Sequence, residues 1–185
     1  MGASALNEPG DEYYWGNTNP VSTNNPDDKF YSPSVGEYGK DGYVPESWSK
    51  YNETDNKTTI DLSDDAARVN WGGNWKIPTS ADFIELANTE NTTATLVKNY
   101  LKRGADGILF TSKTNGNSLF FPVNHEIGTE WGSVELFTCE LDSMYDPWRF
   151  IMHIGDATGT PSYLDECVDN YDSFRFESNF IRPVY

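Results

Sequence analysis

Basic residues are scarce in this chain. Its 185 residues include 13 lysines and arginines against 29 aspartates and glutamates, for a formal net charge of −16. Such a charge repels the phosphate backbone of DNA and RNA, so we exclude nucleic-acid partners, and anionic membrane surfaces are disfavoured for the same reason. Neutral or cationic partners fit this charge. The simplest explanation of the acid excess is solubility outside a cell or on a particle.

Histidine and cysteine are also scarce, with two residues of each. His125 and His153 have no neighbouring nucleophile and no metal-ligand spacing. Cys139 and Cys167 lie too far apart in the sequence for a short metal motif, so we expect unpaired thiols, with one disulfide bridge as the alternative. The sequence also lacks a phosphate loop and the common hydrolase, metalloprotease and dinucleotide-binding motifs. We therefore predict no catalytic residues.

No run of acidic residues has the spacing of a calcium-binding EF-hand loop. The pairs Asp27-Asp28 and Asp64-Asp65 offer carboxylate oxygens, but a solvated loop and a helix start explain them more simply. We predict no cofactor and no metal ligands. A structural calcium ion is the one metal that the acid excess would suit.

Long apolar runs are absent, and no stretch approaches the roughly 18 apolar residues of a membrane-spanning helix, so we predict no membrane insertion. The opening MGASALNEPGDEYYWG has neither a basic segment nor an apolar core, and we expect no signal peptide in it. Aromatic residues make up 15% of the chain, so much of any core must consist of Trp, Tyr and Phe. The length suits a single domain over residues 1–185.

Residues 1–50 are rich in Asn, Pro, Gly, Ser and Asp, which is turn chemistry. Their many aromatic residues need a surface to pack on. We therefore predict a long irregular coil packed over the folded body, with a short strand near residues 12–15.

Two helix starts follow in the stretch DDAARVNWGGNWKIPTSADFIEL, residues 64–86. Ser63 is the predicted cap of the first helix, with two acids in its first turn, and Gly72-Gly73 ends it. Thr79 is the predicted cap of the second helix, with Asp82 as the partner in a capping box. Trp71 and Trp75 flank the glycine pair, and we expect their rings to cover the seam between helices and sheet.

From residue 93 onward the pattern changes to strands. The predicted strands are TATLVKNYL, GILFTSK, SLFFPV, SVELFTCEL, WRFIMHI, a weaker YLDECV, and part of FRFESNFIRPVY. Asn115-Gly116 between the second and third of these is a strong hairpin signal. Two helices followed by several strands predict an α+β fold with a mainly antiparallel sheet.

The segment from Asp64 to Thr79 resembles the signature of the Fibrobacter-type major paralogous (FISUMP) domain, D-D-A-A-x-x-N-W-G-G-x-W-R-M-P-T, with Lys76-Ile77 in place of Arg-Met. Weaker matches are YWG at residues 14–16, TSKTNGNS at 111–118, FFP at 120–122 and RPV at 182–184. The resemblance implies a C-type-lectin-like fold. It covers most of residues 12–185.

The departures from this family lie in the last third of the chain. Leu136-Phe137-Thr138-Cys139 stands where the family tends to have Y-W-S-S, and residues 178–184 depart from G-F-S-V-R-P-V. The last third of C-type-lectin-like folds carries ligand-binding strands and loops, and in the variable proteins of diversity-generating retroelements it is rewritten on a fixed scaffold. The resemblance therefore implies a ligand-binding display domain of bacterial cell surfaces or phage particles, extracellular, with a protein or glycan ligand. A fixed adhesin of gut bacteria, or a fimbrial or phage structural subunit, is the alternative.

Residues 135–180 combine many aromatic residues with acids, and strand alternation sends about half of them to each face. The sequence therefore predicts a contact surface made of Phe137, Cys139, Glu140, Tyr145, Trp148, Phe150, Tyr163, Asp165, Tyr171, Phe176 and Asn179. The calcium-lectin motif E-P-N or Q-P-D with a later W-N-D is absent, which argues against calcium-dependent sugar binding. The formylglycine-generating oxidases share the broad fold and use a cysteine pair for copper, so Cys139 and Cys167 define a competing enzyme hypothesis.

Overall fold

The computed structural model describes residues 10–21, 50–123, 132–142, 147–154, 161–162, 168–169, 175 and 178–185. Its helices are α1 (Ala66–Trp71) and α2 (Ser80–Ala87). Its strands are β1 (Glu12–Tyr14), β2 (Thr92–Tyr100), β3 (Ala105–Ser112), β4 (Ser118–Pro122), β5 (Gly132–Leu141), β6 (Pro147–Ile154), β7 (Pro161–Ser162), β8 (Val168–Asp169) and β9 (Ser178–Phe180). No helix among these residues is long and apolar enough to cross a membrane.

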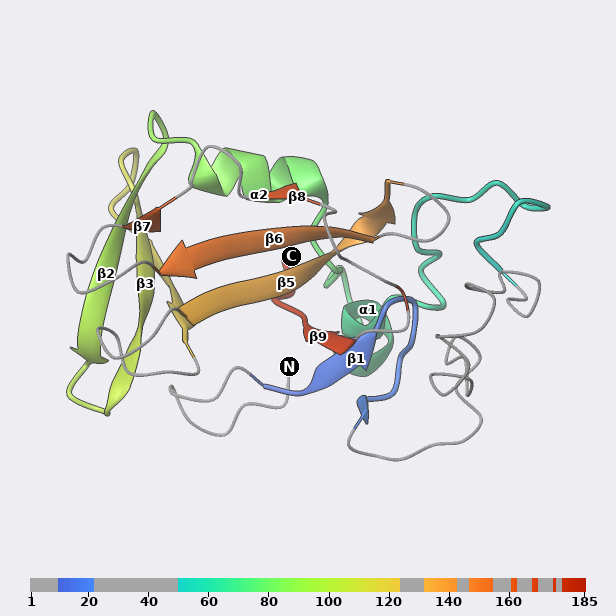
Figure 1. Cartoon of the computed structure of the whole chain (residues 1–185), viewed down its shortest axis with the longest axis horizontal. Helices are drawn as coiled ribbons and strands as arrows, with labels where there is room; N and C mark the ends of the chain where they lie inside the picture. The colour runs from blue at the N-terminus through green and yellow to red at the C-terminus, as the bar shows by residue number, and fades with distance from the viewer. Residues whose placement is uncertain are drawn as a thin grey trace, which may run out of the picture.

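The strands form two sheets. The larger has the order β1-β9-β5-β6-β7, with β8 also paired to β6, and the smaller has the order β2-β3-β4. Every pair is antiparallel except β5 with β9. Figure 1 shows β5 and β6 running along the long axis, with β2 and β3 standing across one end. The predicted α+β class with a mainly antiparallel sheet is confirmed.

The local turn and cap signals explain where several elements begin. Thr79 accepts from the Asp82 backbone N–H while the Asp82 carboxylate accepts from the Thr79 N–H, which is the predicted capping box of α2. The hairpin between β3 and β4 turns through Asn115 and Gly116, and Gly116 has a left-handed φ of 74°. The predicted strand near residues 12–15 is present as β1.

The predicted cap of the first helix is wrong. Asp65, not Ser63, caps α1, because the Asp65 side chain accepts from the Arg68 backbone N–H at 3.0 Å. Asp64 precedes the helix and turns its carboxylate toward Tyr51 instead, at 2.7 Å from the phenol oxygen. The weak strand predicted over residues 163–168 lies mostly outside the described residues, as do residues 1–9 and 22–49 of the predicted coil.

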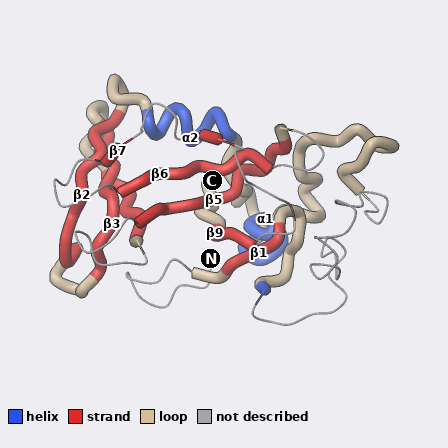
Figure 2. The backbone as a smooth tube through the Cα atoms, viewed as in Figure 1, coloured by secondary structure: helices blue, strands red, loops and turns tan. Residues whose placement is uncertain are grey.

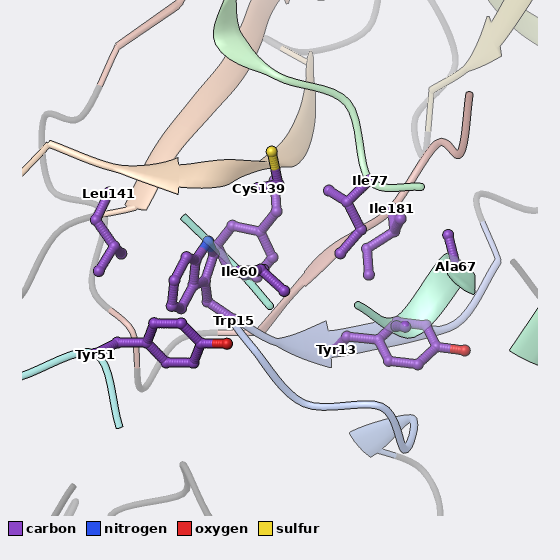
Figure 3. Close-up of a cluster of buried hydrophobic side chains, with 11 residues drawn as sticks. Tyr13, Trp15, Tyr51, Ile60, Ala67, Ile77, Cys139, Leu141 and Ile181 are labelled. Atoms are coloured by element: carbon purple, nitrogen blue, oxygen red, sulfur yellow. The ribbon is translucent and has the colours of Figure 1, made fainter. Parts of the chain in front are cut away.

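Among the described residues, buried side chains form two separate core clusters. The first core cluster consists of Tyr13, Trp15, Tyr51, Ile60, Ala66, Ala67, Ile77, Phe137, Cys139, Leu141 and Ile181. The second core cluster consists of Phe83, Ala87, Ile108, Phe110, Phe121, Val123, Val134, Leu136, Phe150 and Met152. Figure 3 shows the first cluster gathering side chains from β1, β5 and the loop that precedes α1.

Strand β5 contributes to both clusters. Leu136 belongs to the second cluster and its neighbour Phe137 to the first, so successive side chains on opposite faces are both buried. A strand covered on both faces loses the alternation of buried and exposed residues.

Long stretches of the described chain are loops and turns (Figure 2). Residues 50–65 form such a segment, and two backbone hydrogen bonds attach it to β5. The Ile60 N–H donates to the Cys139 carbonyl at 2.9 Å, and the Leu141 N–H donates to the Thr58 carbonyl at 2.8 Å. This segment therefore acts as a partial edge strand for β5.

Candidate ligand-contact site

The structure describes six of the eleven predicted contact residues. The other five, Tyr145, Tyr163, Asp165, Tyr171 and Phe176, lie outside the described residues.

Three of the six are core residues, so the prediction that they face a ligand is wrong. Phe137 and Cys139 are 2% and 7% exposed and belong to the first core cluster. Phe150 is fully buried and stacks on Phe83 of α2, with ring centroids 4.4 Å apart. The cause is the double coverage of β5, together with the burial of the β6 face that carries Phe150 under α2.

Asn179 is also buried, contrary to the prediction. It lies in the short strand β9 between β1 and β5, and its side-chain oxygen accepts from the Phe180 backbone N–H at 2.8 Å. This side chain satisfies a polar group inside the sheet and is not available to a ligand.

Glu140 and Trp148 keep part of their surface exposed. The Glu140 carboxylate accepts from the Ser80 backbone N–H at 2.7 Å and from the Ser80 hydroxyl, so it fastens the start of α2 to β5. Trp148 lies in β6, where its backbone carbonyl accepts from the Thr138 hydroxyl at 2.9 Å. Of the predicted contact residues that the structure describes, only these two are partly exposed.

The two acids of the D-D-A-A motif are structural residues. Asp65 is 3% exposed, and its second carboxylate oxygen accepts from the Ile77 backbone N–H at 3.0 Å. Asp65 therefore joins the start of α1 to the segment that leads into α2. Asp64 accepts from the Tyr51 hydroxyl and from the Lys50 ammonium, both at 2.7 Å.

Tyr51 is the centre of a buried polar network. Its hydroxyl donates to Asp64 and accepts from the Asp61 backbone N–H at 2.7 Å. Burial, followed by these neighbouring acids, raises the pKa of Tyr51 well above its ordinary value. The hydrogen bond to Asp64 is the largest cause that raises the pKa of Lys50 above its ordinary value.

A buried cation lies beside this network. Arg175 is fully buried, and its guanidinium is 5.2 Å from the Trp15 ring centroid and 5.8 Å from the Tyr51 ring centroid. It donates to the Tyr51 carbonyl at 2.6 Å. The charge thus lies near the rings of both Trp15 and Tyr51, which is a favourable environment for a guanidinium.

The glycine pair in WGG permits a sharp reversal after α1. Gly72 and Gly73 both have left-handed backbone angles, with φ of 69° and 59°. The chain then runs back, and Lys76 and Val184 exchange two backbone hydrogen bonds of 2.9 Å. This path brings Trp75 beside Tyr185.

Trp71, Trp75 and Tyr185 form a surface group that we call the aromatic cluster. The rings of Trp71 and Trp75 meet edge to face with centroids 5.1 Å apart, and those of Trp75 and Tyr185 do so at 5.4 Å. Trp71 is 48% exposed and Tyr185 is 79% exposed. About half of the Trp71 surface is therefore covered, and that this ring covers the seam between helices and sheet stays a prediction. The glycine pair in the sequence indicated a turn between Trp71 and Trp75, but it did not indicate which way the two rings point.

Cys139 is a free cysteine, and its thiol is buried. Burial, followed by the charges of Glu140 and Asp65, raises the pKa of Cys139 to about 12. In the absence of a metal this thiol is therefore protonated at neutral pH. Cys167 lies outside the described residues, and within those residues no three His, Cys, Asp or Glu side chains come together as a metal site.

Comparison with known proteins found no matching family model, no matching curated protein and no matching solved structure.

Proposed function

We propose that this chain is a ligand-binding display domain with a C-type-lectin-like fold, similar to the variable proteins of diversity-generating retroelements. It would bind a protein or glycan on another cell or particle through its carboxy-terminal third, and it would work outside the cell, on a bacterial surface or a phage particle. The second candidate is an adhesin or structural subunit of the same fold whose surface is fixed.

The observation that supports this proposal is the structural use of the D-D-A-A…W-G-G motif. Asp64 and Asp65 are buried, and their carboxylate oxygens accept hydrogen bonds from backbone and side-chain donors within the fold. Gly72 and Gly73 supply backbone turns. A motif whose residues are used in this way specifies the scaffold. Residues outside the motif would then contact the ligand.

The carboxy-terminal strands are anchored to that scaffold. Glu140 is bonded to Ser80 of α2, and the Trp15 indole N–H donates to the Thr138 carbonyl of β5 at 3.0 Å. Such anchoring holds the backbone in place while side chains that do not belong to the core vary. This arrangement suits a display surface, because rigid elements lower the entropic cost of presenting a ligand site.

The experiment that tests the proposal is sequencing of the 3′ end of this gene across many individuals of its source population. If the surface is diversified, substitutions will concentrate at adenine-bearing codons within residues 135–180. Buried residues within that range, such as Phe137, Cys139 and Phe150, will remain unchanged together with residues 64–122. A carboxy-terminal third as constant as the scaffold would overturn the diversified function and leave the fixed adhesin.

The oxidase hypothesis is tested separately by titration with Cu(I). A ligand-binding domain is expected to show no tight Cu(I) site, and the Cys139→Ser variant should behave like the unchanged protein. Tight binding of one copper ion that is lost in this variant would contradict the proposal and favour an enzyme.

A further inference from the structure

We propose that the aromatic cluster of Trp71, Trp75 and Tyr185 is a stacking site for a pyranose ring of a neutral glycan. This site lies outside residues 135–180 and does not depend on the display function proposed above.

The cluster is a fixed arrangement of rings. Trp71 ends α1, Trp75 follows a left-handed turn closed by its own N–H donating to the Gly72 carbonyl at 3.3 Å, and Tyr185 follows the two hydrogen bonds between Lys76 and Val184. The rings contact one another at interplanar angles of 85° and 68°. Rings that are already ordered lose little conformational entropy on binding, so they suit a small ligand.

The polar atoms of the rings are available. Among the described residues, neither the indole N–H of Trp71, nor that of Trp75, nor the Tyr185 hydroxyl has a protein hydrogen-bond partner. The exposed side-chain amide of Asn74 lies between the two tryptophans in sequence. A pyranose presents C–H groups to an aromatic face and hydroxyl groups at its edge, so rings with adjacent donors and amides match its chemistry.

The charge around the cluster favours a neutral ligand over a cation. The segments that carry the three rings, residues 66–81 and 178–185, contain no acidic residue. Of their basic residues, Lys76 is paired with Asp82 at 3.7 Å and Arg182 lies over the Phe121 ring, so neither adds a free positive charge to the cluster. A quaternary ammonium ligand would prefer an acidic rim around its aromatic rings.

The three rings alone are smaller than a protein interface. Each aromatic side chain offers about 150–250 Å² in total, so these partly exposed rings present roughly 300 Å². A stable protein interface needs about 800 Å² on each partner. An area of this size suits one or two sugar rings.

The test is saturation-transfer NMR on the whole chain. The probes are the methyl glycosides of glucose, galactose and mannose, with choline as a cationic probe. We expect saturation to reach the ring protons of at least one pyranoside from aromatic protons of the protein, with a Kd of roughly millimolar order. Trp71→Ala should weaken this binding about tenfold or more, and Trp71→Phe should restore part of it.

Ile84→Ala is the matched control, because Ile84 is 57% exposed on α2 and belongs to no aromatic contact in the described residues. It should bind the sugars as the unchanged protein does. Circular dichroism of each variant checks the fold, and Tyr185→Ala gives a second removal if Trp71→Ala unfolds. Transfer to choline alone, no transfer to any pyranoside, or binding equal to that of the unchanged protein by a folded Trp71→Ala variant, or by Tyr185→Ala where Trp71→Ala does not fold, would overturn the proposal.

Discussion

The carboxylate of Asp65 holds two backbone segments at once. One oxygen caps α1 through the Arg68 N–H, and the other accepts from the buried Ile77 N–H. Asp65→Ala removes a helix cap and leaves a buried donor without its acceptor, so we expect the free energy of unfolding to fall by about 2–4 kcal/mol.

Asp65→Asn is the matched variant, because the asparagine side chain keeps one acceptor oxygen. The free energy of unfolding should therefore fall less in Asp65→Asn than in Asp65→Ala. Urea denaturation measures both. Equal losses in the two variants would contradict this account, because the acceptor oxygen that asparagine keeps would then contribute nothing.

The Cys139 thiol should resist chemical modification. Its pKa is raised to about 12, and it lies within the first core cluster, so at pH 8 it is protonated and covered. In a Cys167→Ser background we expect no labelling by iodoacetamide until denaturant is added. Mass spectrometry after a timed reaction reads the result, and rapid labelling of the folded chain would contradict the burial of this side chain.

At the scale of the element, the turn between β2 and β3 holds non-glycine residues in left-handed conformations. Leu101 and Lys102 have φ of 52° and 60°. Such a conformation costs an L-residue about 1–2 kcal/mol, whereas glycine adopts it freely. Lys102→Gly should therefore raise the free energy of unfolding by about 0.5–1 kcal/mol after the added chain entropy is deducted.

Lys98→Gly is the control, because Lys98 is an exposed residue of β2 without a left-handed φ. There we expect a loss of about 0.5–1 kcal/mol. Thermal unfolding of both variants tests the pair, and a destabilised Lys102→Gly protein would show that the turn carries no strain.

Elements with local signals were predictable from the sequence, and elements fixed by distant residues were not. The Thr79 capping box and the Asn115-Gly116 turn depend on neighbours in the chain, and both are present. The cap of α1 at Asp65 depends in part on a distant partner, because the second carboxylate oxygen accepts from the Ile77 N–H, 12 positions along the chain.

The candidate site was harder to predict than the fold for a similar reason. Alternation along β5 predicts one buried and one exposed face. The two core clusters cover both faces, so Phe137 and Cys139 are buried and not part of a contact surface. The outward orientation of Trp71 depends on left-handed backbone angles at two glycines, which composition permits but does not specify.

At the scale of the whole molecule, alkaline pH should destabilise the fold. The pKa of Tyr13 is raised by burial, and then by Asp11, from 10.0 to about 12. Between these two pH values the Tyr13 phenol loses its proton in the unfolded chain but keeps it in the folded chain. The stability that Tyr13 contributes is therefore fully present below pH 10 and is lost as the pH rises toward 12. Tyr51 and Cys139, whose pKa values are also raised, act in the same direction.

We expect the free energy of unfolding to fall between pH 8 and pH 11 by about 1 kcal/mol for each buried phenol. Urea titrations at the two pH values measure the fall. In Tyr13→Phe the fall should be smaller by about that amount, because the removed hydroxyl no longer titrates. An identical pH dependence in the variant would show that Tyr13 titrates normally in the folded protein.

The pairing of β1 with β9 has a consequence for the time course of folding. Glu12 and Ser178, whose side chains bond across this pair at 2.7 Å, lie 166 positions apart in the chain. The β2-β3-β4 meander joins near neighbours and can form early, whereas closure of a loop this long is slow. On a ribosome, β1 cannot pair until β9 has emerged, so the backbone hydrogen-bonding groups of Glu12–Tyr14 lack their strand partner until this end of the chain is made.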